Sequence, residues 1–203
     1  MRRVVAILLA LSLPFTGPPL AAKRAPRLAL DGVWKTDCLP IGKNGRHGFV
    51  TRLEISGMAV VAATQIFAHN TCDVPTVATD YRAVMVSWRT MDDGTTDFEH
   101  DVRSITMTPD AEDVVATYNA SQASGCGLGG GWKLNVARDV AGRFCAPFAF
   151  PATGTRLYER AWVSGDEMRI GSFPIVWTNT SPDRRPTTPG LMVFHRQSVG
   201  RDK

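Results

Sequence analysis

The chain of 203 residues is long enough for one sizeable domain with its own hydrophobic core. Its formal net charge is +4, and without Arg2 and Arg3 the balance is 21 basic against 19 acidic residues. Charges so evenly matched, and scattered along the chain, give no support for a nucleic-acid-binding protein.

The first 22 residues have the pattern of a secretory signal peptide. Arg2 and Arg3 precede an apolar run over Val4–Leu13, and the small residues of "PPLAA" follow. This order predicts cleavage near Ala22. The run is too short to cross a bilayer comfortably, and no later run is long enough to do so. We therefore expect a secreted or periplasmic protein that does not span a membrane, with a flexible lead over residues 23–28.

Residues 29–197 are predicted to form one all-β domain, followed by a polar tail over residues 198–203. The segment "GFVTRLEIS" alternates, so that Phe49, Thr51 and Leu53 share one face of a strand. Ser56–Gly57, Asp93–Gly94 and "SGDE" are turn signals. About ten short strands between such turns favour a single antiparallel barrel or sandwich. The predicted strands cover residues 48–56, 58–68, 81–90, 97–108, 113–118, 131–136, 156–163, 167–173 and 191–197.

Four cysteines follow the predicted cleavage site, namely Cys38, Cys72, Cys126 and Cys145. An even number in an oxidising compartment predicts two disulfides, for which three pairings exist. Cys38–Cys72 with Cys126–Cys145 is the first choice, because each loop is then local. No CxxC pair and no histidine at ligand spacing points to zinc, so no metal is expected.

The segment "SGCGLGGGWK" contains the spacing of a dinucleotide-binding loop, at Gly125, Gly127 and Gly130. Such a loop needs a helix after it, whereas "WKLNV" is typical of a strand. The glycines are therefore predicted to let the chain turn tightly beside a disulfide, and no nucleotide is expected.

The acidic segment "MDDGTTDFEHD" lacks the spacing of a calcium loop. Asp97, Glu99 and Asp101 alternate, which predicts a charged outer face of a strand. The histidines are far apart, and neither HExxH nor GxSxG occurs. No catalytic residue and no cofactor is therefore assigned, although an enzyme acting in the mouth of a barrel remains an alternative.

Two groups of motifs carry a family resemblance. The first group is "LDGVWKTDC", "FVTRLEIS" and "CDVP", and the second is "CGLGGGWKLNV", "DEMRIG", "RRP" and "MVFHR". In this order they resemble the APCDD-type domain of the adenomatosis polyposis coli down-regulated family. The resemblance implies a lipocalin-like β-barrel of about 8–11 strands with disulfides and a lipid-accommodating cavity. Gly32 and Trp34 near the start of the domain, with Arg196 in the last strand, also resemble lipocalins, in which this arginine lies over the ring of the tryptophan in a cation–π contact.

We expect from this a binding protein that holds a small apolar or lipid-like ligand inside the barrel. Aromatic and aliphatic side chains line such pockets. The predicted wall residues are Trp34, Phe49, Leu53, Phe67, Trp88 and Trp132.

The alternative is an interaction module that binds another protein through its loops. The loop "TNTSPDRRPTTPG" at 178–190 is long, and Arg184 and Arg185 are predicted to meet carboxylates or phosphates of a partner.

Overall fold

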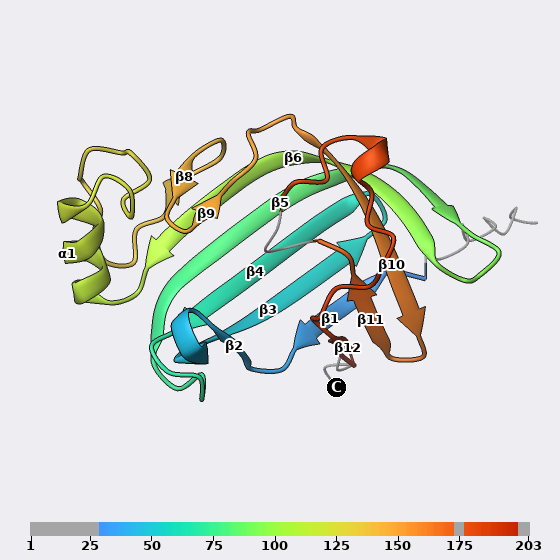
Figure 1. Cartoon of the computed structure of the whole chain (residues 1–203), viewed down its shortest axis with the longest axis horizontal. Helices are drawn as coiled ribbons and strands as arrows, with labels where there is room; N and C mark the ends of the chain where they lie inside the picture. The colour runs from blue at the N-terminus through green and yellow to red at the C-terminus, as the bar shows by residue number, and fades with distance from the viewer. Residues whose placement is uncertain (1–28, 173–176, 199–203) are drawn as a thin grey trace, which may run out of the picture.

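The computed structural model describes residues 29–172 and 177–198, so the predicted signal peptide, the lead and residues 199–203 lie outside the described residues. Most of the regular secondary structure in the described residues is strand (Figure 1). The elements are β1 (Gly32–Thr36), β2 (Leu39–Ile41), η1 (Lys43–Gly45), β3 (His47–Ser56), β4 (Ala59–Phe67), β5 (Pro75–Thr90), β6 (Thr96–Pro109), α1 (Glu112–Ala120), β7 (Arg138–Asp139), β8 (Phe144–Cys145), β9 (Phe148–Ala149), β10 (Arg156–Ser164), β11 (Glu167–Ile170), η2 (Pro182–Arg184) and β12 (Phe194–Arg196).

Eight of these strands form one closed antiparallel barrel. Strands β3 to β6 follow one another as a meander, and β10, β11, β12 and β1 complete the circle. The barrel closes because β1 pairs with β12 on one side and with β3 on the other. The prediction of a single antiparallel β-barrel is confirmed.

The strands begin and end where the turn chemistry predicts. The β3–β4 turn holds Gly57 at φ 56°, the β5–β6 turn holds Gly94 at φ 82°, and the β10–β11 turn holds Gly165 at φ 58°. Only glycine adopts such positive φ values at no steric cost. Along β3 the residues Phe49 and Leu53 are buried, whereas Arg52 is exposed, as the alternation predicts.

Two predicted strands are wrong. Residues 113–118 lie in the helix α1, whose Val114, Val115 and Tyr118 pack against the core from one face. A short apolar run of this kind fits a helix as well as a strand, so its periodicity does not decide between them. Residues 131–136 form an irregular segment, because Gly131 and Asn135 adopt positive φ values that a strand does not contain.

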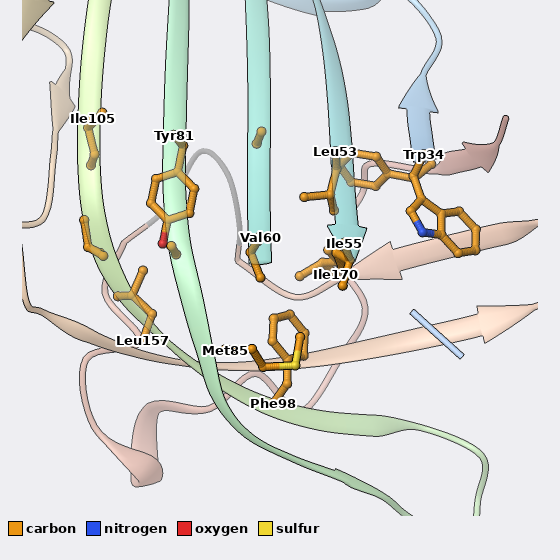
Figure 2. Close-up of a cluster of buried hydrophobic side chains, with 14 of the residues drawn as sticks. Trp34, Leu53, Ile55, Val60, Tyr81, Met85, Phe98, Ile105, Leu157 and Ile170 are labelled. Carbon is orange, nitrogen blue, oxygen red and sulfur yellow. The ribbon is translucent and has the colours of Figure 1, made fainter. Parts of the chain in front are cut away.

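Much of the barrel interior is filled with apolar side chains. Figure 2 shows several of them projecting from different strands into the enclosed space. At most 2 % of the surface of each of these side chains is exposed: Trp34, Leu53, Met85, Phe98, Leu157, Met168 and Phe194. The core therefore lies inside the barrel, and any ligand site must occupy space that these residues leave free.

None of the helices in the described part of the chain is long and apolar enough to cross a membrane.

Candidate functional site: an apolar pocket at one end of the barrel

A pocket opens at the end of the barrel where β2, β8 and β9 lie (Figure 1). Its cavity volume is about 50 Å³, which is the volume that the centres of water molecules can occupy. The wall consists of side chains from β2 to β6, from β9 and from the segments after β9 and before η2. They are Ile41, Phe49, Ala62, Thr64, Ile66, Thr79, Tyr81, Ile105, Phe148, Phe150 and Trp177.

The strand alternation places the first part of this wall. Residues two apart on a strand share a face, so Ala62 and Ile66 on β4 point into the barrel, as do Thr79 and Tyr81 on β5. Ile66 and Thr79 lie in the halves of their strands remote from the β3–β4 turn, whereas the paired residues Ala62 and Tyr81 belong to the packed core.

The β8–β9 hairpin supplies the second part of the wall. Its Cys145 is bonded to Cys126, in the turn that follows α1. The amide of Phe150 donates to the carbonyl of Arg143 at 2.8 Å, which extends the hairpin ladder by one residue beyond β8 and β9. Phe148 and Phe150 thereby face the strands of the barrel across the pocket.

Aromatic rings form a continuous series along the pocket. The ring centroids of Tyr81 and Trp177 are 5.2 Å apart, those of Phe150 and Trp177 are 6.4 Å apart, and those of Phe148 and Phe150 are 6.3 Å apart. These spacings are within the range of attractive ring–ring contacts. The series joins β9 to Tyr81 on β5.

Polar side chains lie beneath Tyr81, deeper in the barrel. The ring of His100 on β6 is 6.0 Å from that of Tyr81 and stacks on Phe98 at 5.5 Å. Glu159 on β10 is fully buried and accepts a hydrogen bond from Asn179 Nδ2 at 2.6 Å. We call Tyr81, His100, Glu159 and Asn179 the inner polar cluster.

Burial controls the ionisation of this cluster. It lowers the pKa of His100 to about 4, so the ring is neutral at pH 7. It raises the pKa of Tyr81 far above its usual value, and the negative charges of Glu159 and Asp101 add to this effect. The phenol of Tyr81 is therefore neutral, and its hydroxyl oxygen is buried.

The predicted wall residues are dispersed over the molecule. Phe49 lines the pocket. Trp34 and Leu53 are fully buried in the core, and Trp132 is buried against Tyr118 of α1, with a centroid distance of 5.0 Å. Phe67, at the end of β4, does not contribute to the pocket, and Trp88 is 47 % exposed near the β5–β6 turn.

Arg184 and Arg185 have different environments. Arg184 is exposed in η2. The guanidinium of Arg185 donates to the carbonyl oxygens of Phe98 and Glu159 at 3.1 and 2.7 Å, and to the carboxylate of Glu99 at 3.1 Å. Arg185 therefore fastens its loop to β6 and β10, and only Arg184 is directed toward solvent.

The outer face of β6 carries the predicted row of acidic residues. Asp97 is paired with Arg160, and Asp101 with Arg156. Among the described residues, no group of three His, Cys, Asp or Glu side chains is placed to hold a metal ion.

Both disulfides have the pairing of the first choice, Cys38–Cys72 and Cys126–Cys145. The glycine cluster makes the turn beside the second disulfide. A Cβ atom on Gly125 would lie 2.1 Å from the carbonyl oxygen of Tyr118, so no larger residue fits there. The cluster follows the helix α1 instead of preceding a helix, so the arrangement that a dinucleotide loop requires is absent from this segment.

Sequence reasoning missed most of the pocket and the whole inner polar cluster. One signal was present: His100 and Glu159 occupy positions of the apolar face in "FEHDV" and "LYERAWV", where a polar residue is unexpected. For Phe148 and Phe150 there was no such signal, since their segment has no periodic pattern.

Comparison with family models and with curated proteins finds no match to this chain.

Proposed function

We propose that this protein binds a small apolar ligand in the pocket at the end of its barrel. The observation that carries the proposal is an open cavity lined by aliphatic and aromatic side chains, next to a barrel core that is otherwise packed. An enzyme would need a reactive group at the cavity, and the described lining consists of apolar residues, two threonines and a neutral tyrosine.

Transfer of apolar surface from water into the pocket would drive binding. Each buried methylene contributes about 0.8 kcal/mol, and the wall is already assembled before the ligand enters. The β8–β9 hairpin and Trp177 cover one side of the site, so a bound ligand would be enclosed between them and β3, β4 and β5.

The test is an NMR titration of the mature protein with small apolar compounds. We expect saturable shifts of the amide signals of pocket residues on β4, β5 and β9. Thr79→Phe fills the pocket from a partly exposed position, and should weaken binding by about tenfold or more because it removes the space the ligand occupies.

Ala78→Phe is the matched control, because Ala78 is adjacent on β5 and points to the outer face. Binding that survives Thr79→Phe unchanged, or shifts confined to residues outside the pocket, would remove the basis for the proposal.

We also propose that the protein is exported and is an APCDD-type domain. Two disulfides support export, since they persist in oxidising compartments. The guanidinium carbon of Arg196 lies 3.9 Å from the ring centroid of Trp34, the contact that the resemblance to lipocalins implies, and this supports the lipocalin-like barrel expected of such a domain. Cell fractionation combined with N-terminal sequencing tests export: a chain that retains residues 1–22 in the cytosol would contradict it.

A further inference from the structure

Two hairpins lie next to each other at the end of the barrel opposite the β8–β9 hairpin (Figure 1). Strands β6 and β10 are paired as far as Thr96 and Ala161, where their ladder ends. Beyond that pair, a cleft separates the β5–β6 turn from the β10–β11 turn, and we call it the tip cleft. Residues 93–95 form one of its walls, and the tip of the β10–β11 hairpin forms the other.

The tip cleft has room for a molecule of the size of a substituted ring. The volume that the centres of water molecules can occupy is about 260 Å³, against about 50 Å³ in the apolar pocket. An apolar protein cavity of about 150 Å³ holds benzene. A six-membered ring with several substituents therefore fits the space of the tip cleft.

The register of β10 and β11 gathers four of the lining side chains on one face of their hairpin. Trp162 is opposite Arg169, and Ser164 is opposite Glu167. Cross-strand partners share a face, and so do residues two apart on a strand. The indole of Trp162, which is partly exposed, therefore lies on the same face as a guanidinium, a hydroxyl and a carboxylate.

The wall from the β5–β6 turn adds a second carboxylate. The hydroxyl and the amide of Thr95 donate to Oδ1 of Asp93 at 2.7 and 2.9 Å. These hydrogen bonds lower the pKa of Asp93, so its carboxyl group is ionised at neutral pH. On the other wall, the guanidinium of Arg169 donates to the carbonyl of Gly190 at 3.3 Å. The cleft thus offers anchored hydrogen-bond acceptors and donors around one aromatic ring.

This mixture of groups favours an uncharged ligand with several hydroxyl groups. A cation would be repelled by Arg169, and an anion by Asp93 and Glu167. A wholly apolar ligand would cover these side chains without giving them hydrogen-bond partners. Hydroxyl groups both donate and accept, so they can pair with carboxylates and with a guanidinium alike.

We propose that the tip cleft binds a sugar ring, with the C–H face of the ring on Trp162 and its hydroxyl groups on Asp93, Glu167 and Arg169. The site is separate from the apolar pocket, so this proposal does not rest on the function proposed for that pocket.

The experiment is an NMR titration of the wild-type protein with three neutral sugars that differ in the arrangement of their hydroxyl groups. They are methyl β-D-glucopyranoside, methyl β-D-galactopyranoside and methyl α-D-mannopyranoside. We expect at least one of them to shift the Trp162 indole N–H signal and the amide signals of residues 93–95 and 162–169, with a Kd of about 1 mM. Cyclohexanol, which has a six-membered ring and one hydroxyl group, should bind at least about tenfold more weakly.

Two variants test the two kinds of contact. Trp162→Leu removes the ring and should weaken sugar binding by about fivefold or more. Its control is Trp88→Leu, since Trp88 is 47 % exposed near the β5–β6 turn and does not line the cleft. Glu167→Gln removes only a charge from an exposed side chain and should weaken binding by about threefold. Its control is Asp166→Asn, on the same turn but outside the lining.

Several results would overturn the proposal. Failure of all three glycosides to shift the signals of the tip cleft would do so, and so would cyclohexanol binding as tightly as the best sugar. Tighter binding of D-glucosamine or D-glucuronate than of the best neutral sugar would show that the cleft selects an ion instead. If Trp162→Leu and Glu167→Gln change sugar binding no more than their controls do, the sugar does not contact the residues assigned to it, and the proposal is wrong.

Discussion

His100 is a histidine on the core-facing side of β6, with none of its surface exposed. Burial lowers its pKa to about 4, which is below the value of about 6.5 for a histidine in an unfolded chain. Between these two pH values the unfolded chain binds a proton that the folded protein does not bind. Acid therefore shifts the equilibrium toward the unfolded state.

We expect the free energy of unfolding to fall as the pH is lowered from 6.5 toward 4, with His100 accounting for at most about 3 kcal/mol. Denaturant unfolding at a series of pH values measures the slope of the free energy of unfolding against pH. In the variant His100→Phe, whose ring can still stack on Phe98, the slope over this interval should be much smaller. His69→Asn is the control, because the side chain of His69 is 61 % exposed. An unchanged slope in His100→Phe would assign the acid sensitivity to other groups.

At the scale of elements, the two disulfides fasten different parts of the wall. Cys38–Cys72 lies against β3, where a Cβ atom on Gly48 would come within 2.6 Å of the sulfur of Cys72. Cys126–Cys145 joins the turn after α1 to β8, and thereby holds the β8–β9 hairpin beside the barrel. Since β8 and β9 pair only with each other, their position depends on this link, on side-chain packing and on the backbone hydrogen bond from the Ala146 amide to the carbonyl of Ala123.

Replacing both Cys126 and Cys145 by serine should lower the free energy of unfolding by about 3 kcal/mol, the value for a loop of this length. It should also release the hairpin, so that hydrogen exchange of the Phe150 amide becomes faster while the β3–β4 ladder stays protected. Replacing Cys38 and Cys72 is the control, with slow exchange expected at Phe150. Equal exchange rates at Phe150 in both variants would mean that the hairpin is held without the disulfide.

At the scale of the whole molecule, β1 closes the barrel between the two ends of the described chain. Trp34 on β1 is opposite Arg196 on β12 and opposite Leu53 on β3. The guanidinium of Arg196 covers the Trp34 ring and donates to the carbonyl oxygens of Asp31 and Ala29 at 2.7 and 3.1 Å. One side chain thus links the first strand, its preceding turn and the last strand.

Arg196→Ala should lower the free energy of unfolding by about 2 kcal/mol, because it removes a cation–π contact and two hydrogen bonds from a charged donor. The denaturation midpoint measures this loss, with the slope of the transition unchanged. Arg52→Ala provides the comparison, since the Arg52–Glu54 pair is about half exposed and such pairs contribute about 0 to 1 kcal/mol. A loss no greater than that of Arg52→Ala would show that barrel closure does not depend on Arg196.

The sequence was informative wherever structure is decided by neighbours along the chain. Alternation along "GFVTRLEIS" identified the buried face of β3, glycines located the hairpin turns, and cysteine spacing identified both disulfides. It failed at residues 113–118, where one helical turn and one strand have the same short apolar pattern. Among the six predicted wall residues, only Phe49 lines the pocket, because an aromatic side chain satisfies a packed core as well as a cavity.

The sequence by itself determined an all-β fold and its turns, and favoured the two cross-links among three possible pairings, since hydrophobic period, glycine and cysteine act locally. Only the tertiary structure decided where the interior stays open and what lies beneath the opening. The pocket joins Ile41 to Trp177 across more than half of the chain, and the inner polar cluster joins Tyr81 to Asn179. No local sequence pattern encodes contacts between residues so far apart in the chain. The closure of the sheet brings these residues together, and the packing of their side chains fixes the space between them.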